Sequence, residues 1–311
     1  MHLTPLIAAC SFTSTLLALN PTAPLSDSHP AAAIPQSAAS AAASTSEVPW
    51  PADDAGLQTL GNELITSAMR RFATQDFSGM ESAWLPCYQS IRFAGPADRD
   101  ESLKVAKGLA ITDTPKITQV RATRAGDALV VTCLAAVGQT IGGERLAGTP
   151  APRLGVWQFD GGAWKVAAWA NLNMPTERPA PAAPAFPGDA SLNAQGAAML
   201  QTFLGTQQRK DIPAYEKWID PHAQVVNFRG QIAAADLQKG VKAATSGVPT
   251  LHDARTTRCG GLTVVTCNLS MSQDFGLGGK LPADPAPFLA VFSGTGDTAK
   301  VIALANTNKP R

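Results

Sequence analysis

The chain has 311 residues, which is room for about two domains, because a single hydrophobic core rarely grows beyond roughly 250 to 300 residues. Charged residues make up 16% of the sequence, and 25 Lys and Arg against 24 Asp and Glu leave a formal net charge of +1. This balance excludes the basic excess expected of a nucleic-acid-binding protein, and it equally excludes an acidic tail or a polybasic membrane patch.

The first 52 residues differ in composition from the rest of the chain, and the first Lys or Arg is Arg70. Residues 1–19 are mostly apolar and contain no Asp, Glu, Lys or Arg, as in the core of a signal peptide, but polar residues interrupt them too often for a membrane span. Residues 20–52 are rich in Ala, Ser and Pro and hold too little apolar bulk to form a core. We therefore predict a signal-like segment followed by a flexible tether.

Within the apolar segment, Ile7-Ala8-Ala9-Cys10-Ser11 resembles the lipobox of bacterial lipoproteins, in which small residues precede a cysteine that becomes diacylated. The resemblance implies that Cys10 carries a lipid, and the tether would then let the folded part of the chain clear the membrane surface. Two alternatives remain at this point, an exported form without lipid and a disordered N-terminus with no targeting role.

After the tether, helical patterns precede strand patterns. An apolar stripe at helical spacing from Leu57 to Phe72 follows Asp53 and Asp54, which can cap the N-terminus of a helix. A short helix then ends near Pro86, and a further helix is predicted from Asp98 to Leu109. Strands are predicted at residues 91–94, 117–124, 129–141, 154–160 and 164–172. Helices followed by an antiparallel meander indicate an α+β domain in which a curved sheet folds around the helices.

The strongest signal in the sequence is an internal repeat. Residues 165–175 align with residues 300–310 at an offset of 135, with seven of eleven positions identical, where chance gives about one identity at most. The run from Val130 to Cys133 likewise recurs from Val264 to Cys267. One domain has therefore been duplicated within the chain.

The repeat predicts the domain organisation. We expect one domain at 53–175, its copy at 189–311, and between them a Pro-rich, semi-rigid linker at 176–188 that is not a packed element. The order of elements, with Asp76-Phe77 between the first two helices and a closing strand from Trp164 to Asn171, resembles the nuclear transport factor 2-like superfamily. This superfamily includes the ketosteroid isomerase-like and SnoaL-like domains. The resemblance implies two repeated cone-shaped domains, each with N-terminal helices packed on a curved antiparallel sheet.

Many members of this superfamily dimerise through the outer faces of their sheets, and the resemblance implies that the two copies here form such a pair within one chain. The closing strand is compatible with this pseudo-dimer because neither of its faces is polar. Strand alternation predicts Val166, Ala168 and Ala170 on one face and Ala167 and Trp169 on the other.

Isomerase-type members of the superfamily place a carboxylate base near the first strand and hydrogen-bond donors around the developing oxyanion. The matching positions in this chain hold Arg92 and Asn227, and neither side chain accepts a proton at ordinary pH. A SnoaL-like or ketosteroid isomerase-like isomerase, cyclase or hydrolase using the first cone is the alternative function. In that case Asp76, Asp98 or Glu101 would have to supply the carboxylate.

Four residues of the first copy are candidates for ligand binding. Arg121 and Trp157 fall on predicted strands and Arg153 directly precedes one, while Arg92 lies at the position where isomerase-type members of the superfamily place their base. Arginine can grip a carboxylate with two parallel hydrogen bonds, so these side chains could form an anion-binding patch at the mouth of the cone. Alternatively they are solvated strand arginines and a core tryptophan, since alternation alone does not decide which face is inward. Phe288 replaces Arg153 in the second copy, so such a patch would belong to the first cone only.

The cysteines and histidines predict neither a metal site nor a disulfide. The four cysteines after Cys10 lack Cys-x-x-Cys spacing, and two of them, Cys133 and Cys267, lie in apolar strand patterns typical of small buried residues. The other two are Cys87 and Cys259. The one His/Asp cluster in the sequence, formed by His222 and His252 with Asp220 and Asp253, fits no metal motif. We expect no metal ion and no cofactor.

Taken together, these features predict an exported, lipid-anchored, non-enzymatic binding module in the periplasm or on the outer membrane of a bacterium. Its expected partner is a protein of the cell envelope or an apolar small molecule, and its only contact with the membrane would be the N-terminal lipid. A third interpretation makes the two copies a rigid spacer without a pocket.

Overall fold

The computed structural model describes residues 48–111, 113–141, 143–146, 148–177, 179–276 and 279–310. The signal-like segment, most of the tether and Cys10 lie outside these residues. None of the helices in the described part of the chain is long and apolar enough to span a membrane.

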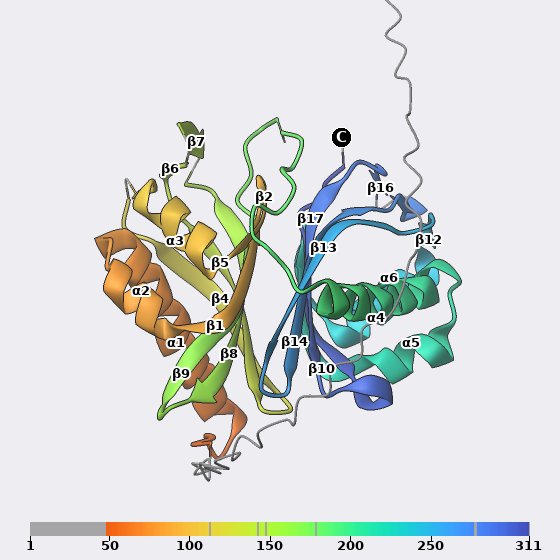
Figure 1. Cartoon of the computed structure of the whole chain (residues 1–311), viewed down its shortest axis with the longest axis horizontal. Coiled ribbons are helices and arrows are strands. Elements are labelled where there is room, and N and C mark those ends of the chain that lie inside the picture. The colour runs from red at the N-terminus through yellow and green to blue at the C-terminus, as the bar shows by residue number, and fades with distance from the viewer. Residues whose placement is uncertain are drawn as a thin grey trace, which may run out of the picture. The chain divides into compact units, whose positions relative to one another are not determined.

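The first half begins with two helices, and a third lies among the strands (Figure 1). The helices are α1 (Asp54–Thr74), α2 (Phe77–Ala83) and α3 (Arg99–Lys107). The strands are β1 (Trp84–Arg92), β2 (Gly95–Asp98), β3 (Ala110–Ile111), β4 (Lys116–Ala125), β5 (Ala128–Ala136), β6 (Gln139–Ile141), β7 (Glu144–Leu146), β8 (Pro150–Asp160) and β9 (Ala163–Asn171).

The second half repeats this order. Its helices are α4 (Ala190–Gln208), α5 (Ile212–Trp218) and α6 (Ala234–Ala243). Its strands are β10 (Ile219–Asn227), β11 (Gly230–Ala233), β12 (Thr245–Ser246), β13 (Thr250–Cys259), β14 (Leu262–Ser270), β15 (Gln273–Asp274), β16 (Lys280–Leu281), β17 (Ala286–Ser293) and β18 (Lys300–Asn306).

Each half contains a six-stranded sheet with the same strand order. The order is β2-β1-β9-β8-β5-β4 in the first half and β11-β10-β18-β17-β14-β13 in the second. Neighbouring strands are antiparallel, except that the closing strands β9 and β18 run parallel to β1 and β10. A three-stranded sheet accompanies each of them, β3-β6-β7 and β12-β15-β16. These two matching α+β halves confirm the predicted fold class.

Aspartates at the helix starts explain where the helices begin. Among the described helices, five of the six have an aspartate whose carboxylate accepts a hydrogen bond from a backbone N–H in the first turn. These residues are Asp53, Asp76, Asp98, Asp189 and Asp211. The sixth helix, α6, begins after Ala233 and has no side-chain cap. The cap predicted at Asp53 is confirmed.

Two strand predictions were wrong in their extent. The strand predicted at 91–94 begins at Trp84, directly after α2, and Pro86 lies inside it. Between Trp84 and Gln89 the register with β9 shifts, and a proline is tolerated at such an irregularity because no regular ladder hydrogen bond is lost. The long strand predicted at 129–141 is interrupted at Val137 and Gly138, which separates β5 from β6.

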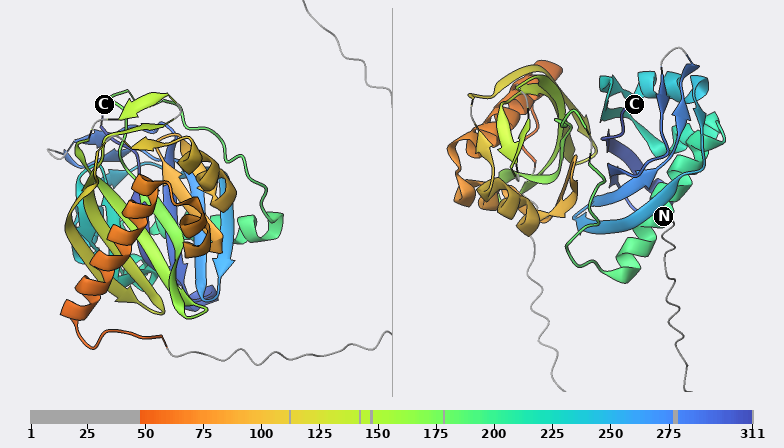
Figure 2. Two further views of the ribbon diagram at one scale, coloured as in Figure 1. Left: turned by 90° about the vertical axis from the view of Figure 1, so that its left-hand side faces the viewer. Right: turned by 90° about the horizontal axis from the view of Figure 1, so that it is seen from above.

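The inner face of each sheet carries the helices. In the first half, alternate residues of β5 such as Leu129, Val131 and Cys133 pack with Ile65 and Met69 of α1. The left view of Figure 2 shows α1 lying across the strands of this sheet. The helices therefore cover one face of the sheet, and the other face needs a different partner to bury it.

That outer face packs against the other half. Val130 and Val156 of the first sheet lie in one buried cluster with Val264 and Val291 of the second. The two halves consequently form one compact unit with a shared apolar layer between their sheets.

The alternation predicted for the closing strand was wrong at two positions, Val166 and Ala167. Val156 pairs with Ala168, but Trp157 pairs with Val166, so Ala167 is a bulged residue. A bulge puts the alternation of side chains on its two sides out of phase. Val166 therefore joins Trp169 on the inner face, while Ala167 lies with Ala168 in the layer between the sheets.

Two glutamines connect the halves reciprocally. Gln89 of β1 donates from Nε2 to Thr257 Oγ1 at 2.9 Å and to the Val264 carbonyl at 3.2 Å. Gln224, its counterpart at an offset of 135, donates to Thr123 Oγ1 at 3.0 Å and to the Val130 carbonyl at 2.8 Å. Because each glutamine is buried and satisfied only by the other half, these contacts specify how the two sheets align.

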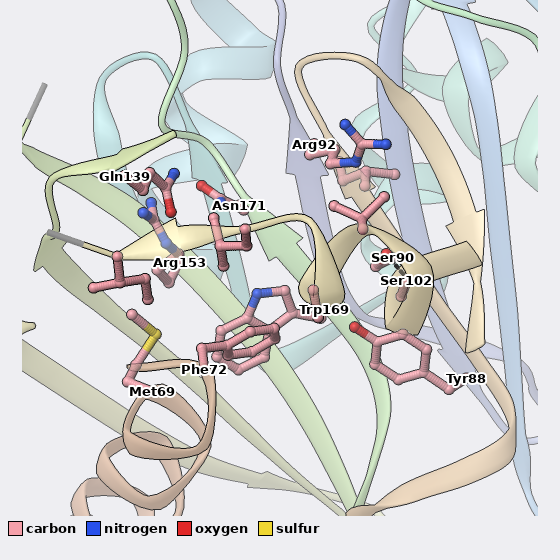
Figure 3. A pocket seen from close by; sticks show the side chains of 15 residues that line it. Met69, Phe72, Tyr88, Ser90, Arg92, Ser102, Gln139, Arg153, Trp169 and Asn171 are labelled. Carbon is pink, nitrogen blue, oxygen red and sulfur yellow. Dashed lines mark hydrogen bonds between the residues drawn. The ribbon is translucent and has the colours of Figure 1, made fainter. Parts of the chain in front are cut away.

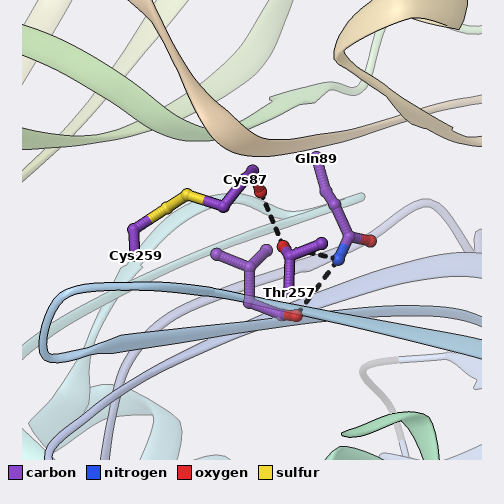
Figure 4. Close-up of a disulfide and its surroundings, with 5 residues drawn as sticks. Cys87, Gln89, Thr257 and Cys259 are labelled. Carbon is purple, nitrogen blue, oxygen red and sulfur yellow. Dashed lines mark hydrogen bonds between the residues drawn. A yellow bond between two sulfur atoms is a disulfide. The ribbon is translucent and has the colours of Figure 1, made fainter. Parts of the chain in front are cut away.

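A disulfide between Cys87 and Cys259 also joins the halves, and the prediction of no disulfide was wrong (Figure 4). The two cysteines are 172 residues apart, which hid the pair from any spacing argument. Their counterparts in the repeat are His222 and Ala125, so the bond exists on only one side of the duplicated interface. Cys133 and Cys267 are free and buried, as predicted.

The linker between the halves is packed, contrary to prediction. The Ala182 N–H donates to the Ala94 carbonyl at 2.8 Å, and the Ala182 carbonyl accepts from Asn268 Nδ2 at 3.0 Å. Phe186 is buried, and its carbonyl accepts from Nε of Arg255 at 3.1 Å. Proline stiffens this segment, and these contacts attach it to both halves.

Candidate functional site

A cavity of about 70 Å³ lies inside the first cone, between the helices and the inner face of the sheet. Its apolar wall includes Met69 and Phe72 of α1 and Trp169 of β9. Its polar wall has two sides, one built from β6, β8 and the end of β9, and the other from β1 and α3 (Figure 3).

Arg153, on β8, is the most deeply buried charged group of the cavity, with 1% of its surface exposed. Its Nη1 donates to the carbonyls of Ala151 at 3.3 Å and Pro152 at 3.0 Å, both on its own strand. Burial lowers the pKa of Arg153 to about 10, and the neighbouring Cys133 thiol acts weakly in the opposite direction. None of the ion pairs found among the described residues includes this guanidinium.

Gln139 and Asn171 lie on the same side as Arg153 (Figure 3). Gln139 is 5% exposed, and its Nε2 is a buried donor for which the described atoms offer no acceptor. Asn171 pairs with Arg153 across β9 and β8, and its Oδ1 accepts from the Asn173 N–H at 2.9 Å. This side of the cavity is therefore rich in hydrogen-bond donors.

The other polar side consists of hydroxyl groups and a second arginine. Ser90 and Ser102 share a hydrogen bond of 2.7 Å. Burial raises the pKa of Tyr88, although hydrogen bonds with both serines partly oppose the shift. Burial also lowers the pKa of Arg92, and the charge of Glu101 counteracts this. Figure 3 places the Arg92 guanidinium away from Arg153, across the cavity.

Of the four candidate residues, the structure brings Arg92 and Arg153 to this cavity but not Arg121 or Trp157. Arg121 is exposed on β4, because its side chain projects from the edge strand of the sheet. Trp157 is a core residue, 2% exposed, with its ring edge-on to Trp169 at 6.1 Å. Gly155 makes room for that ring, since a Cβ there would lie 2.4 Å from it.

The carboxylates considered for an enzyme lie elsewhere. Asp76 and Asp98 cap α2 and α3, where each accepts a hydrogen bond from a backbone N–H at 2.9 Å. Glu101 is paired with Lys104 at 3.5 Å on α3. The described residues that line the cavity include no Asp or Glu, and those of the chain as a whole contain no cluster of three or more His, Cys, Asp or Glu suited to a metal ion.

The two histidines of the sequence cluster make separate contacts. The His222 carbonyl accepts from Thr123 Oγ1 at 2.8 Å, and its N–H donates to Asp220 Oδ1 at 2.8 Å. His252 hydrogen-bonds Ser270 through Nε2 at 2.9 Å.

The second cone is apolar at several positions where the first is polar. At an offset of 135, four polar residues of the first cavity have apolar counterparts: Tyr88 and Ala223, Ser90 and Val225, Ser102 and Leu237, Arg153 and Phe288. Arg153 and Phe288 occupy equivalent places, because each pairs with the last residue of its closing strand. Ala223, Val225 and Phe288 belong to the hydrophobic core of the second half, with Leu237 packed against it.

Sequence reasoning did not identify Gln139, Ser90, Ser102 or Asn171 as site residues. A signal was present for the serines, because they differ in polarity from their counterparts in the repeat. Gln139 gave no such signal, since Gln273, at an offset of 134 and at the equivalent place in the strand pairing, is also a glutamine.

No protein-family profile matches this sequence, and no curated protein matches it. Solved structures do. A nuclear transport factor 2-like protein from Cytophaga hutchinsonii is 13% identical, with a TM-score of 0.32 over 36% of this chain and 94% of its own. A nuclear transport factor 2-like protein from Rhodospirillum rubrum is 16% identical, with a TM-score of 0.31 over 34% and 93%. The CaMKII association domain of C. elegans is 13% identical, with a TM-score of 0.30 over 38% and 98%. Each half of the described chain combines three helices with a six-stranded sheet of the same strand order.

Proposed function

We propose that this chain is an exported, lipid-anchored binding module that holds a small organic molecule in its first cone. One observation carries the proposal. The first cone has a cavity lined by polar side chains, whereas four of these positions hold apolar core side chains in the duplicate. Buried polar groups cost stability unless they are satisfied, so a ligand that satisfies them explains why they are present.

The chemistry of the lining favours binding over catalysis. Its polar groups are guanidinium, amide and hydroxyl groups, and the described lining lacks the carboxylate or imidazole that most proton-transfer reactions use. Neither arginine can act as a general base at neutral pH. The same groups are well suited to hold a polar group of a ligand beside the apolar wall of Met69, Phe72 and Trp169.

The second half supports the first instead of adding a second site. Its sheet covers the outer face of the first sheet, which would otherwise expose a large apolar surface. Gln224 and the disulfide hold it there. In this proposal the duplicate has the role that a partner subunit has in a dimer of single cones.

Export is supported by the disulfide, because such bonds persist in oxidising compartments and are rare in the cytosol. We propose that the module resides in the periplasm or on the outer membrane, attached through Cys10. Radiolabelled palmitate should label the wild-type protein expressed in bacteria and should not label the C10A variant. Equal labelling of both, or labelling of neither, would remove the anchor from the proposal.

The binding proposal is tested with a library of small organic molecules, using native mass spectrometry and thermal shift. Ser102→Leu introduces the residue of the second cone and reduces the space and polarity of the cavity. The matched control is Thr59→Leu, at an exposed position of α1 outside the lining. We expect ligands that stabilise the wild type and the control but not S102L. A library without any hit, or hits that bind S102L equally well, would contradict the proposal, and turnover of a bound compound would favour the isomerase, cyclase or hydrolase alternative.

A further inference from the structure

We propose that the ligand is a small monocarboxylate whose carboxylate binds Arg153 and Gln139, with its apolar part against Phe72 and Trp169. This inference rests on the proposed function and adds the chemical class of the ligand. Two independent features of the same side of the cavity lead to it, a buried cation without an acidic partner and a buried amide donor without an acceptor.

The first feature is the charge of Arg153. A guanidinium has five N–H donors, and the hydrogen bonds among the described residues use only Nη1. Two backbone carbonyls supply partial negative charge but do not neutralise a cation that is 1% exposed. A buried charge without a counterion is costly, and an anion that enters the cavity would remove that cost.

The second feature is the amide of Gln139. Its Nε2 is buried and lacks a hydrogen-bond partner among the described residues, and Figure 3 shows the side-chain amide group near the Arg153 guanidinium. Guanidinium and amide N–H groups side by side can donate to the two oxygens of one carboxylate, because the planar fork of arginine matches the geometry of that group.

Charge and size restrict the ligand further. The single buried guanidinium matches one negative charge, while Arg92 is partly exposed and already interacts with Glu101. A cavity volume of 70 Å³ corresponds to about five water-sized positions, at roughly 10 to 15 Å³ each. A short aliphatic acid therefore fits, with its chain along Phe72 and Trp169, and longer acids would extend through the mouth of the cavity.

The test compares four probes by isothermal titration calorimetry: valerate, its neutral amide valeramide, 1-pentanol and butyl phosphate. We expect valerate to bind the wild type, and the two neutral probes to bind at least about 50-fold more weakly because they leave the guanidinium unpaired. Tighter binding of valeramide or pentanol would overturn the carboxylate assignment while leaving the binding module intact. Tighter binding of butyl phosphate would replace carboxylate by phosphate. Failure of every probe on the wild type would overturn the assignment too, and library hits of other chemistry would then show that the proposed function itself survives.

Three variants locate the carboxylate. Arg153→Met keeps an unbranched, flexible side chain and removes the charge, and we expect it to weaken valerate binding by about 100-fold or more. Gln139→Leu removes the amide donor and should weaken binding by about tenfold. The control Arg145→Met alters an exposed arginine on β7 and should leave the affinity unchanged. Equal affinity of R153M and R145M would overturn the proposal.

The folding of R153M is checked by its melting temperature without ligand. Replacing a buried unpaired cation by a hydrophobic side chain is often neutral or stabilising, so we expect no decrease. If R153M does not fold, the proposal is decided by Q139L and by the binding of the four probes to the wild type. The proposal then stands only if Q139L loses affinity for valerate and the wild type rejects the two neutral probes.

Discussion

Replacement of Gln224 by leucine tests whether the reciprocal glutamines hold the two halves together. Gln224 belongs to the second half and is 2% exposed, yet its side-chain hydrogen bonds all go to the first half. Its Nε2 donates to Val130, Thr123 and the Arg121 carbonyl, and its Oε1 accepts from Thr132 Oγ1.

The expected cost follows from these contacts. Each net hydrogen bond contributes about 1 kcal/mol, and the fully buried Thr132 hydroxyl is left without its partner at a cost of about 1 to 3 kcal/mol. Burial of the added leucine surface returns part of this loss. We expect Gln224→Leu to lower the free energy of unfolding by about 3 to 4 kcal/mol, or the melting temperature by about 6 to 12 °C.

A second substitution separates the hydrogen bond from simple packing. Thr132→Val alone should cost about 1 to 2 kcal/mol, because it leaves the Gln224 oxygen unpaired. In the Q224L background the same change should be neutral or stabilising, because both polar partners are then replaced by apolar groups.

The assay is urea unfolding of oxidised protein followed by tryptophan fluorescence. The matched control is Gln231→Leu, whose amide also reaches across the halves, to the Gln119 carbonyl at 2.9 Å, but lies at the surface. That variant should lose less than about 0.5 kcal/mol. If Q224L is no more destabilising than Q231L, or if Thr132→Val costs the same in both backgrounds, the interpretation of this interface is refuted.

Three further predictions concern the disulfide, the helix caps and the pH dependence of stability. The double variant Cys87→Ser/Cys259→Ser should have a free energy of unfolding in urea about 4 to 5 kcal/mol lower than the wild type, because the disulfide closes a loop of 172 residues. A loss below about 1 kcal/mol would contradict this prediction. Asp98→Ala removes the cap of α3 and should lower the free energy of unfolding by about 1 kcal/mol. Ala233→Asp should raise it by about 1 kcal/mol by capping α6, so the two variants should shift the melting temperature in opposite directions. Burial lowers the pKa of Arg153 to about 10, so the folded protein binds this proton less tightly than the unfolded chain does. The cost of burying the charge is present below pH 10 and is relieved above it, so the wild type should gain stability relative to R153M between about pH 10 and pH 11. A constant difference in unfolding free energy between the two proteins would show that Arg153 keeps an ordinary pKa.

The sequence was sufficient for features that depend on near neighbours along the chain. The cap at Asp53 required only the aspartate and the apolar stripe that follows it. The repeat between residues 165–175 and 300–310 correctly predicted matching closing strands, because equal sequences with equal surroundings adopt equal local structure. The predicted α+β class followed from the order of these elements.

Predictions that depended on the face of a strand were less successful. The bulge at Ala167 reversed the orientation expected for Val166, and a bulge of this kind leaves no periodic mark in the sequence. For the same reason, alternation could not show that Arg153 points into the cone while Arg121 lies exposed on an edge strand. The interpretation of Trp157 as a core residue was available from the sequence but could not be chosen over the ligand-binding one.

By itself, the sequence determined the duplication, the start of the first helix and the order of helices and strands, because these follow from residues close together in the chain. Only the tertiary structure decided the pairing of Cys87 with Cys259, the reciprocal contacts of Gln89 and Gln224, and the meeting of Arg153 with Gln139. The bond and the glutamine contacts join groups that are about 90 to 180 residues apart, and the meeting in the cavity depends on which way strands from two different sheets face. These contacts form only when the sheets pack against each other, and the spacing of residues along the chain does not predict them.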